Sequence, residues 1–133
     1  MAIPVVLVLR GILKRPDNRF LLLKRSSRSK SWPGKWEFPG GKVDRGENPD
    51  DALRREFLEE TALSVGPQEL FRDFFWEREK DRIHYKIFFV KYLSGEVKIS
   101  DEHDNSGWFS LDEIKSMDIS SPLLGIMKLL EKL

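Results

Sequence analysis

The chain has 133 residues with 23 basic and 22 acidic side chains, a formal net charge of +1, and no cysteine. A chain of this length supports one hydrophobic core, so we expect a single domain over residues 1–133. The balanced charge argues against binding to nucleic acid or to an acidic membrane surface, and the lack of cysteine excludes a disulfide scaffold and thiolate metal sites.

The N-terminal segment, MAIPVVLVLRGILK, is apolar, but it is too short and too interrupted to span a bilayer. It also lacks the charged lead-in and the small-residue cleavage site of a signal peptide. We therefore expect a soluble protein of the cytoplasm. The sequence does not fix the oligomeric state, and a homodimer stays an open alternative to a monomer.

Two apolar runs predict the first two strands. Residues Val5–Lys14, rich in Val, Leu and Ile, predict a buried strand, and Phe20–Arg25 predict a second one. A short polar turn, Arg15–Asn18, joins them, so we expect an antiparallel hairpin.

A polar and basic segment without periodicity, Ser26–Ser31, follows the second strand. It is interpreted as a flexible surface loop or, alternatively, as a mobile arm that closes over phosphates. Lys24 and Arg25 stand at its root, where either side chain could contact a phosphate. A short strand at Trp36–Phe38 is predicted next.

The segment after this strand predicts a sharp turn and then a helix. Gly40 and Gly41 permit the turn, because glycine adopts a positive φ without steric penalty. Asn48 is a typical N-cap, and Pro49 is favoured at the first helical position. Two aspartates follow in the first turn, where acidic groups favour the positive end of the helix dipole. We expect the helix to begin at Pro49.

The remaining sequence predicts further strands and two helices. Strands are expected at Glu69–Arg78 and Ile83–Tyr92, as a brief edge strand at Val97–Ile99, and beginning or ending at Trp108–Phe109. Ser110 is expected to begin a short helix, with Glu113 at the capping-box position. An apolar stripe predicts a last helix over Pro122–Leu133 that packs on the core.

Three carboxylates share one face of the helix that begins at Pro49. Glu56, Glu59 and Glu60 stand at i, i+3 and i+4, within an arc of about 100°. The like-charged pair Glu56 and Glu60 costs a few tenths of a kcal/mol on a bare helix. The face is either a solvated, salt-bridged surface or a site for a divalent cation such as Mg²⁺ or Mn²⁺, which take oxygen ligands. Spacing alone leaves both interpretations open.

The spacing of the whole segment closely resembles the Nudix box. The matching positions are Gly41, then five residues, Glu47, then seven residues, Arg55-Glu56-Phe57, any residue, Glu59-Glu60, any residue, and Ala62-Leu63. The family has glycine where this chain has Ala62. An alanine in the left-handed conformation costs roughly 1 kcal/mol; alternatively, the helix runs on by a residue or two.

The resemblance implies a fold, a reaction and a cofactor. Nudix proteins are α/β proteins, built as an α/β/α sandwich around a mixed β-sheet, in which the box forms a loop–helix–loop. They hydrolyse nucleoside diphosphates linked to another group, and they use a divalent metal, which implies a nucleotide substrate and Mg²⁺ or Mn²⁺ here.

The resemblance also implies roles for the residues of the box. Glu56, Glu59 and Glu60 match the metal-binding positions, and Glu59 is also a candidate catalytic base. Arg55 matches the arginine that orients the glutamates. Glu47 matches the early glutamate, which lies near a further metal ion or braces the loop.

Further site residues are expected outside the helix. The turn glycines Gly40 and Gly41, together with Lys24 and Arg25, are assigned to substrate binding.

Family members commonly add an acid from a distant loop, and Asp101–Asp104 resembles that loop. We assign Glu102 as a catalytic base or as a residue that completes the metal site. His84 and His103 are interpreted as structural or surface residues, and their scarcity argues against a histidine-based zinc site.

The segment WEFPGGK is similar to the MutT-like branch, which cleaves nucleoside triphosphates to monophosphate and pyrophosphate. The downstream proline and tyrosine that mark ADP-ribose and dinucleoside polyphosphate hydrolases are absent. The asparagine with which MutT reads its base is also absent, since Ser120-Ser121-Pro122 stand there, so no base is assigned. Hydrolysis of ADP-ribose or another nucleotide derivative and a non-catalytic nucleotide-binding module stay open as alternatives.

Overall fold

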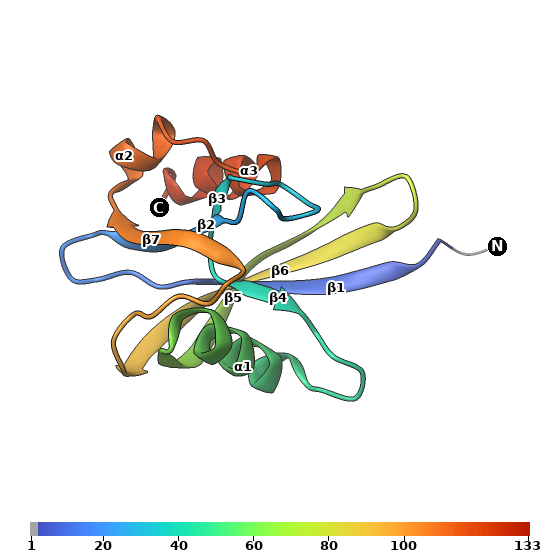
Figure 1. Ribbon diagram of the computed structural model, residues 1–133, viewed down its shortest axis with the longest axis horizontal. Coiled ribbons are helices and arrows are strands. Elements are labelled where there is room, and N and C mark those ends of the chain that lie inside the picture. The colour runs from blue at the N-terminus through green and yellow to red at the C-terminus, as the bar shows by residue number, and fades with distance from the viewer. Residues whose placement is uncertain (1–2) are drawn as a thin grey trace.

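A computed structural model describes residues 3–133 (Figure 1). The strands are β1 (Val5–Ile12), β2 (Phe20–Arg25), β3 (Trp36–Glu37), β4 (Gly40–Lys42), β5 (Ser64–Glu77), β6 (Arg82–Ser94) and β7 (His103–Phe109). The helices are α1 (Pro49–Thr61), α2 (Leu111–Lys115) and α3 (Ser121–Leu130).

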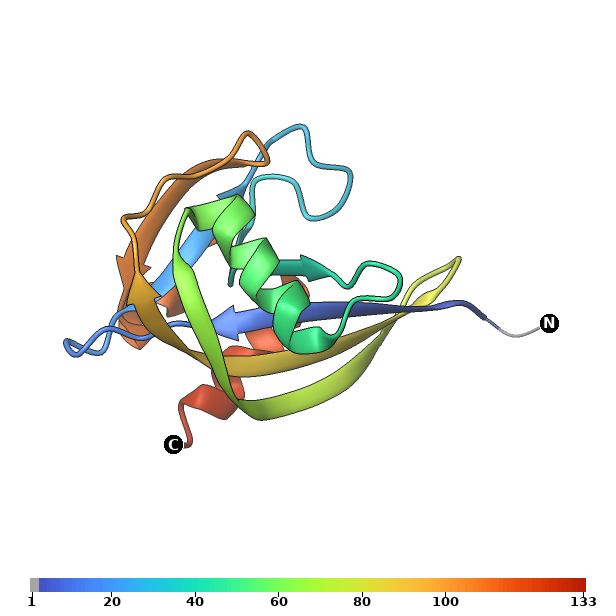
Figure 2. The ribbon, with the colours of Figure 1, turned by 90° about the horizontal axis from the view of Figure 1, so that it is seen from below.

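The strands form two sheets. A four-stranded sheet has the order β4-β1-β6-β5, and a three-stranded sheet has the order β3-β2-β7. Strands β1 and β6 are parallel, whereas the other pairs are antiparallel, so the arrangement is mixed. Helix α1 lies on one side of the strands and α2 and α3 lie on the other (Figures 1 and 2). The predicted α/β class, with helices on both sides of mixed strands, is confirmed.

Strands β1 and β2 read as continuous apolar runs because both of their faces are buried. Val8 and Leu22 belong to a core cluster that includes the apolar face of α3, whereas Leu9 and Leu23 belong to a second cluster that includes Leu53 and other α1 residues. Alternate residues of each strand therefore contribute to two cores, one on each side.

The predicted hairpin of β1 and β2 is wrong. Strand β1 is flanked by β4 and β6, and β2 is flanked by β3 and β7, so the two strands belong to different sheets. Near the turn, a single antiparallel bridge joins Lys14 and Phe20, and the Leu21 N–H donates to the Leu13 carbonyl at 3.1 Å. Because both edges of β1 are occupied, it offers no edge to β2 beyond the turn.

The predicted edge strand at Val97–Ile99 is also wrong, since these residues form no strand. The Val97 and Ile99 side chains pack against the core cluster that includes Leu53, and the Lys98 N–H donates to the Thr61 carbonyl at 2.9 Å. The backbone therefore binds the end of a helix instead of a neighbouring strand. Strand β5 begins five residues before its predicted start at Glu69 and continues through register shifts on either side of Pro67.

The predicted helix starts are confirmed for α1 and α2. Asn48 Oδ1 accepts the Asp51 N–H at 2.9 Å, with Pro49 in the first turn, and Ser110 forms a capping box with Glu113. Helix α1 ends at Thr61, and Ala62 adopts the left-handed conformation with φ 62°. The helix therefore does not run on past Thr61, and the left-handed conformation of Ala62 costs about 1–2 kcal/mol.

Helix α3 begins one residue before the predicted Pro122 and ends at Leu130, three residues before the predicted end. Across residues 3–133, none of the helices combines the length and the apolar character needed to cross a membrane.

Candidate active site

The glycine turn lies directly against the strand and the helix that flank it. Gly40 has φ 150°, and a Cβ built on it would lie 1.9 Å from the carbonyl oxygen of Leu9. The Gly40 N–H donates to Glu60 Oε1 at 2.9 Å. A Cβ on Gly41 would lie 2.6 Å from the carboxyl carbon of Glu56. Gly40 thus permits the turn to lie against the backbone of β1, and Gly41 permits it to lie against the Glu56 carboxylate.

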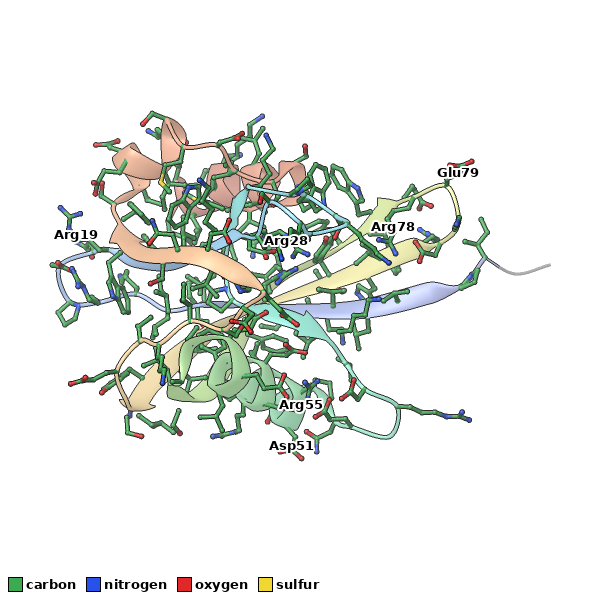
Figure 3. The ribbon with its side chains drawn as sticks, in the orientation of Figure 1. Arg19, Arg28, Asp51, Arg55, Arg78 and Glu79 are labelled. Atoms are coloured by element: carbon green, nitrogen blue, oxygen red, sulfur yellow. The ribbon has the colours of Figure 1, made fainter. Side chains whose placement is uncertain are left out.

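Arg55 is surrounded by carboxylates and extends from α1 toward the loop between β4 and α1 (Figure 3). Its Nε and Nη2 donate to Glu47 at 2.8 and 3.0 Å, and its Nη1 lies 3.1 Å from both Glu56 Oε1 and Glu59 Oε2. Hydrogen bonding to Arg55 lowers the pKa of Glu47, and the surrounding acids raise the pKa of Arg55. Arg55 therefore fixes the positions of three box glutamates.

The three glutamates of the α1 face differ in exposure. Glu60 is 4% exposed, and burial raises its pKa to about 8. The side chain of Glu56 is 13% exposed, and burial also raises its pKa, against the opposing effect of Arg55. The Glu59 side chain is 57% exposed. Glu56 and Glu60 have thus lost much of the water that would stabilise their charges, a loss that a divalent cation would offset.

A buried ion-pair network lies behind these glutamates. Glu37, which is 4% exposed, contacts Arg10 Nη2 at 3.0 Å and Arg25 Nη1 at 2.8 Å. Burial raises the pKa of Glu37, but Arg10, His103 and Arg25 together outweigh burial and hold it below its usual value. Arg10 Nη1 also donates to the Gly40 carbonyl at 3.0 Å. The network therefore anchors the glycine turn.

Arg10 and Glu37 are site residues that we did not assign from the sequence. The signal for Arg10 was a charged residue inside the apolar run of a strand, where a buried charge needs a partner. Glu37 stands in the WEFPGGK segment, but its partners come from other strands, so nothing local identified them.

The two basic residues expected at the phosphates differ in their surroundings. Arg25 donates to Ser29 Oγ at 3.1 Å and to the Ser31 carbonyl at 2.7 Å, so it fastens the polar loop 26–31 to β2. Arg25 also lines both cavities described next, whereas Lys24 lines neither of them.

Two cavities adjoin the buried Glu60. We call the first, of about 320 Å³, the motif cleft; its walls include Glu56, Glu59, Glu60, Gly40, Gly41, Lys42, Arg25, Arg78, Trp32, Val6, Val8, Ile83, Tyr85 and Glu102. We call the second, of about 400 Å³, the loop cleft; it is lined by Arg25, Ser26, Arg28, Ser29, Glu60, Asp101, Glu102 and His103. Figure 3 shows Arg28 on the loop between β2 and β3.

The segment before β7 brings Glu102 to the box helix. In Figure 2 this segment, the C-terminal end of α1 and the β2–β3 loop lie at the same end of the molecule. A carboxylate oxygen of Glu60, one of Glu102 and a ring nitrogen of His103 lie within 4.8 Å of one another. These groups could hold a divalent cation together with oxygens of a substrate. By contrast, Glu47 lies in the loop before α1, pairs with Arg55 and lines neither cleft.

Comparison with known proteins agrees with this geometry. A model of the NUDIX domain matches residues 6–128. The 8-oxo-dGTP diphosphatase of Haemophilus influenzae is 33% identical over 92 residues, which are 69% of this chain and 67% of that protein. The nucleoside triphosphatase NudI of Escherichia coli is 29% identical over 115 residues, which are 78% and 82% of the two chains.

The fold comparison agrees as well. The crystal structure of the MutT protein from Methanosarcina mazei Go1 superimposes with a TM-score of 0.89 and 27% identity, over 99% of this chain and 96% of that chain. The family model spans most of the sequence and includes the whole segment that resembles the box. The chain therefore belongs to the NUDIX domain family and is a Nudix hydrolase with MutT-like relatives.

Proposed function

We propose that this protein hydrolyses nucleoside or deoxynucleoside triphosphates to the monophosphate and pyrophosphate, using Mg²⁺ or Mn²⁺. The observation that carries the proposal is the composition of the motif cleft. Its lining combines the box glutamates Glu56, Glu59 and Glu60 with the apolar or aromatic side chains of Val8, Ile83 and Tyr85. An apolar wall suits a nucleobase, and carboxylates with a divalent cation suit a polyphosphate. The names of the Haemophilus influenzae and Escherichia coli relatives support a triphosphate substrate.

The cleft also offers cations for phosphate oxygens. Lys42 and Arg78 line it from β4 and from the end of β5, and Arg25 lines it from β2. Figure 3 shows Arg78 near the turn between β5 and β6. These side chains come from three separate elements, so they can contact different phosphate groups of one substrate.

Each box residue has a place in this proposal. Glu56 and Glu60 hold the cation with Glu59, which is the most exposed of the three. Arg55 keeps Glu56 and Glu59 in position, and Glu47 braces Arg55, because both Glu47 oxygens accept from it. A bound divalent cation would offset charge on the polyphosphate and favour loss of a proton from water. Glu59 and Glu102 are the candidate bases for that proton.

The proposal extends to organisation and location. We expect residues 1–133 to act as one domain in the cytoplasm on a small nucleotide, without binding nucleic acid or membrane. A homodimer is compatible with these features.

A product assay tests the function. The full chain is incubated with Mg²⁺ or Mn²⁺ and with unmodified or oxidised triphosphates, ADP-ribose, dinucleoside polyphosphates or nucleotide sugars, and products are separated by anion exchange. We expect monophosphate and pyrophosphate in equal amounts from triphosphates, and hydrolysis in ¹⁸O water locates the attacked phosphorus. Turnover of ADP-ribose alone would move the substrate to another Nudix class. Nucleotide binding without turnover of any substrate would support a binding module instead.

A further inference from the structure

The imidazole of His103 is buried beside two carboxylates at the loop cleft. Its side chain is 3% exposed and lines the cleft with Glu60 and Glu102. One ring nitrogen and one oxygen from each glutamate lie within 4.8 Å of one another. Ligands at about 2.1 Å on opposite sides of one cation lie about 4.2 Å apart. Adjacent ligands of such an ion lie about 3 Å apart, so the three groups need to approach one another by roughly 1–2 Å to share an ion.

The hydrogen bonding of the ring leaves one nitrogen free. Nε2 lies 3.4 Å from Glu37 Oε2, and Glu37 is paired with Arg10 and Arg25. Because the ionised carboxylate only accepts, Nε2 donates in this contact, and in the neutral tautomer that fits the contact Nδ1 presents a lone pair. Within residues 3–133, Nδ1 is buried without a hydrogen-bond partner. A buried nitrogen without a hydrogen-bond partner is rare in native structures, and a bound metal ion would explain it.

The contact between His103 and Glu37 also resembles the surroundings of a metal-binding histidine. Histidines that bind metals in proteins commonly donate their other N–H to a carboxylate, which fixes the tautomer and makes the ligating nitrogen more basic. The His103–Glu37 contact has this form. The backbone N–H of His103 donates to the Ser100 carbonyl at 3.2 Å, and this hydrogen bond helps to hold the start of β7 in place.

We propose that His103 supplies a nitrogen ligand, together with Glu60 and Glu102, to a divalent-cation site that favours first-row transition-metal ions over Mg²⁺. Two carboxylates balance the charge of one such ion, and the imidazole adds a ligand that Mg²⁺ takes poorly. This inference rests on the proposed function, because Glu60 and Glu102 also belong to its site. It revises the sequence-based interpretation of His103 as a purely structural or surface residue.

Pulsed electron paramagnetic resonance of Mn²⁺ tests the ligand directly. The metal-free full chain is loaded with Mn²⁺ without nucleotide, and electron spin-echo envelope modulation detects a directly bound ¹⁴N nucleus. We expect ¹⁴N modulation from the wild-type protein. Its absence at saturating Mn²⁺ would overturn the proposal, and this outcome depends on no variant that could misfold.

Two variants identify the histidine. His103→Gln is expected to lose the ¹⁴N modulation and to bind Mn²⁺ at least tenfold more weakly, with a smaller change for Mg²⁺. His84→Gln is the matched control, since His84 makes an exposed contact with Asp73 and does not line the loop cleft. Modulation that persists in His103→Gln would overturn the assignment.

Failure of this metal-ligand assignment can be distinguished from failure of the proposed function. Pyrophosphate release with Mg²⁺ and no ¹⁴N modulation would reject this inference alone. Nitrogen coordination without turnover of any nucleotide would support the His103 ligand and reject the proposed reaction.

Discussion

Two ion-pair networks of opposite composition lie close to Glu60. In the first, a single cation, Arg55, is shared by Asp44, Glu47, Glu56 and Glu59 at the edge of α1. In the second, a single buried anion, Glu37, is shared by two arginines, Arg10 and Arg25. We call them the Arg55 network and the Glu37 network. The first has an excess of negative charge and the second an excess of positive charge.

The difference indicates what each network can bind. Excess negative charge in partly buried carboxylates favours a metal cation, and excess guanidinium charge favours phosphate oxygens. The Glu37 network also differs in burial, so its charges depend on one another for stability, whereas the Arg55 network retains contact with solvent. We therefore expect changes in the first network to affect catalysis most and changes in the second to affect folding most.

The largest expected effect is on catalysis. Changing Glu56 and Glu60 together to Gln keeps their shape but removes two negative charges from the cation site. We expect kcat to fall at least 10³-fold, equivalent to about 4 kcal/mol of transition-state stabilisation. Steady-state pyrophosphate release with Mg²⁺ measures kcat. Glu69→Gln serves as the control, because Glu69 does not line the motif cleft. Wild-type kcat in the double variant would refute the cation assignment.

A pair of substitutions compares the folding roles of the two networks. Glu37→Gln leaves the partly buried Arg10 and Arg25 without the buried anion that they share, and we expect the free energy of unfolding to fall by about 3 kcal/mol. Glu47→Gln should cost much less, because Arg55 keeps Glu56 and Glu59 as partners. Urea denaturation at neutral pH measures both. Equal losses in the two variants would contradict the distinction drawn from burial.

The pH dependence of the free energy of unfolding tests the raised pKa of Glu60. Burial raises the pKa of Glu60 from an ordinary 4.5 to about 8, so folding favours the protonated form. Its contribution to stability is full below about pH 4.5 and is lost as the pH rises through 8. In EDTA, the free energy of unfolding of the wild type should therefore decline from pH 5 to 8 relative to Glu60→Gln. Parallel curves for the two proteins would exclude a raised pKa.

The smallest expected effect concerns the end of α1, apart from both networks. Ala62 occupies a left-handed conformation that glycine adopts without penalty, so Ala62→Gly should stabilise the fold by about 1 kcal/mol. Thermal and urea unfolding measure the gain. Because no box glutamate moves, kcat should not change, and a loss of kcat would show that the helix end influences the site.

The sequence predicted those parts of the site that lie within one segment. Asn48 and Pro49 mark the helix start through local chemistry, and the spacing of Glu56, Glu59 and Glu60 places these three carboxylates on one face of the helix. The Glu37 network was not predicted, because Arg10, Glu37 and Arg25 come from three strands whose pairing is set by the tertiary fold. For the same reason, the short turn after β1 suggested a hairpin, although a turn does not determine which strands become neighbours.

The parallel pairing of β1 with β6 has a consequence for how the protein folds. Val5 pairs with Arg82, and Ile12 pairs with Phe89, so β1 pairs with a strand that is synthesised much later. Contacts of such long sequence separation slow folding because a large loop must close first. Arg10 lies on β1, so closure of this loop helps to fix its position in the Glu37 network. We therefore expect the ability to bind metal and nucleotide to appear late, after most of the chain has left the ribosome.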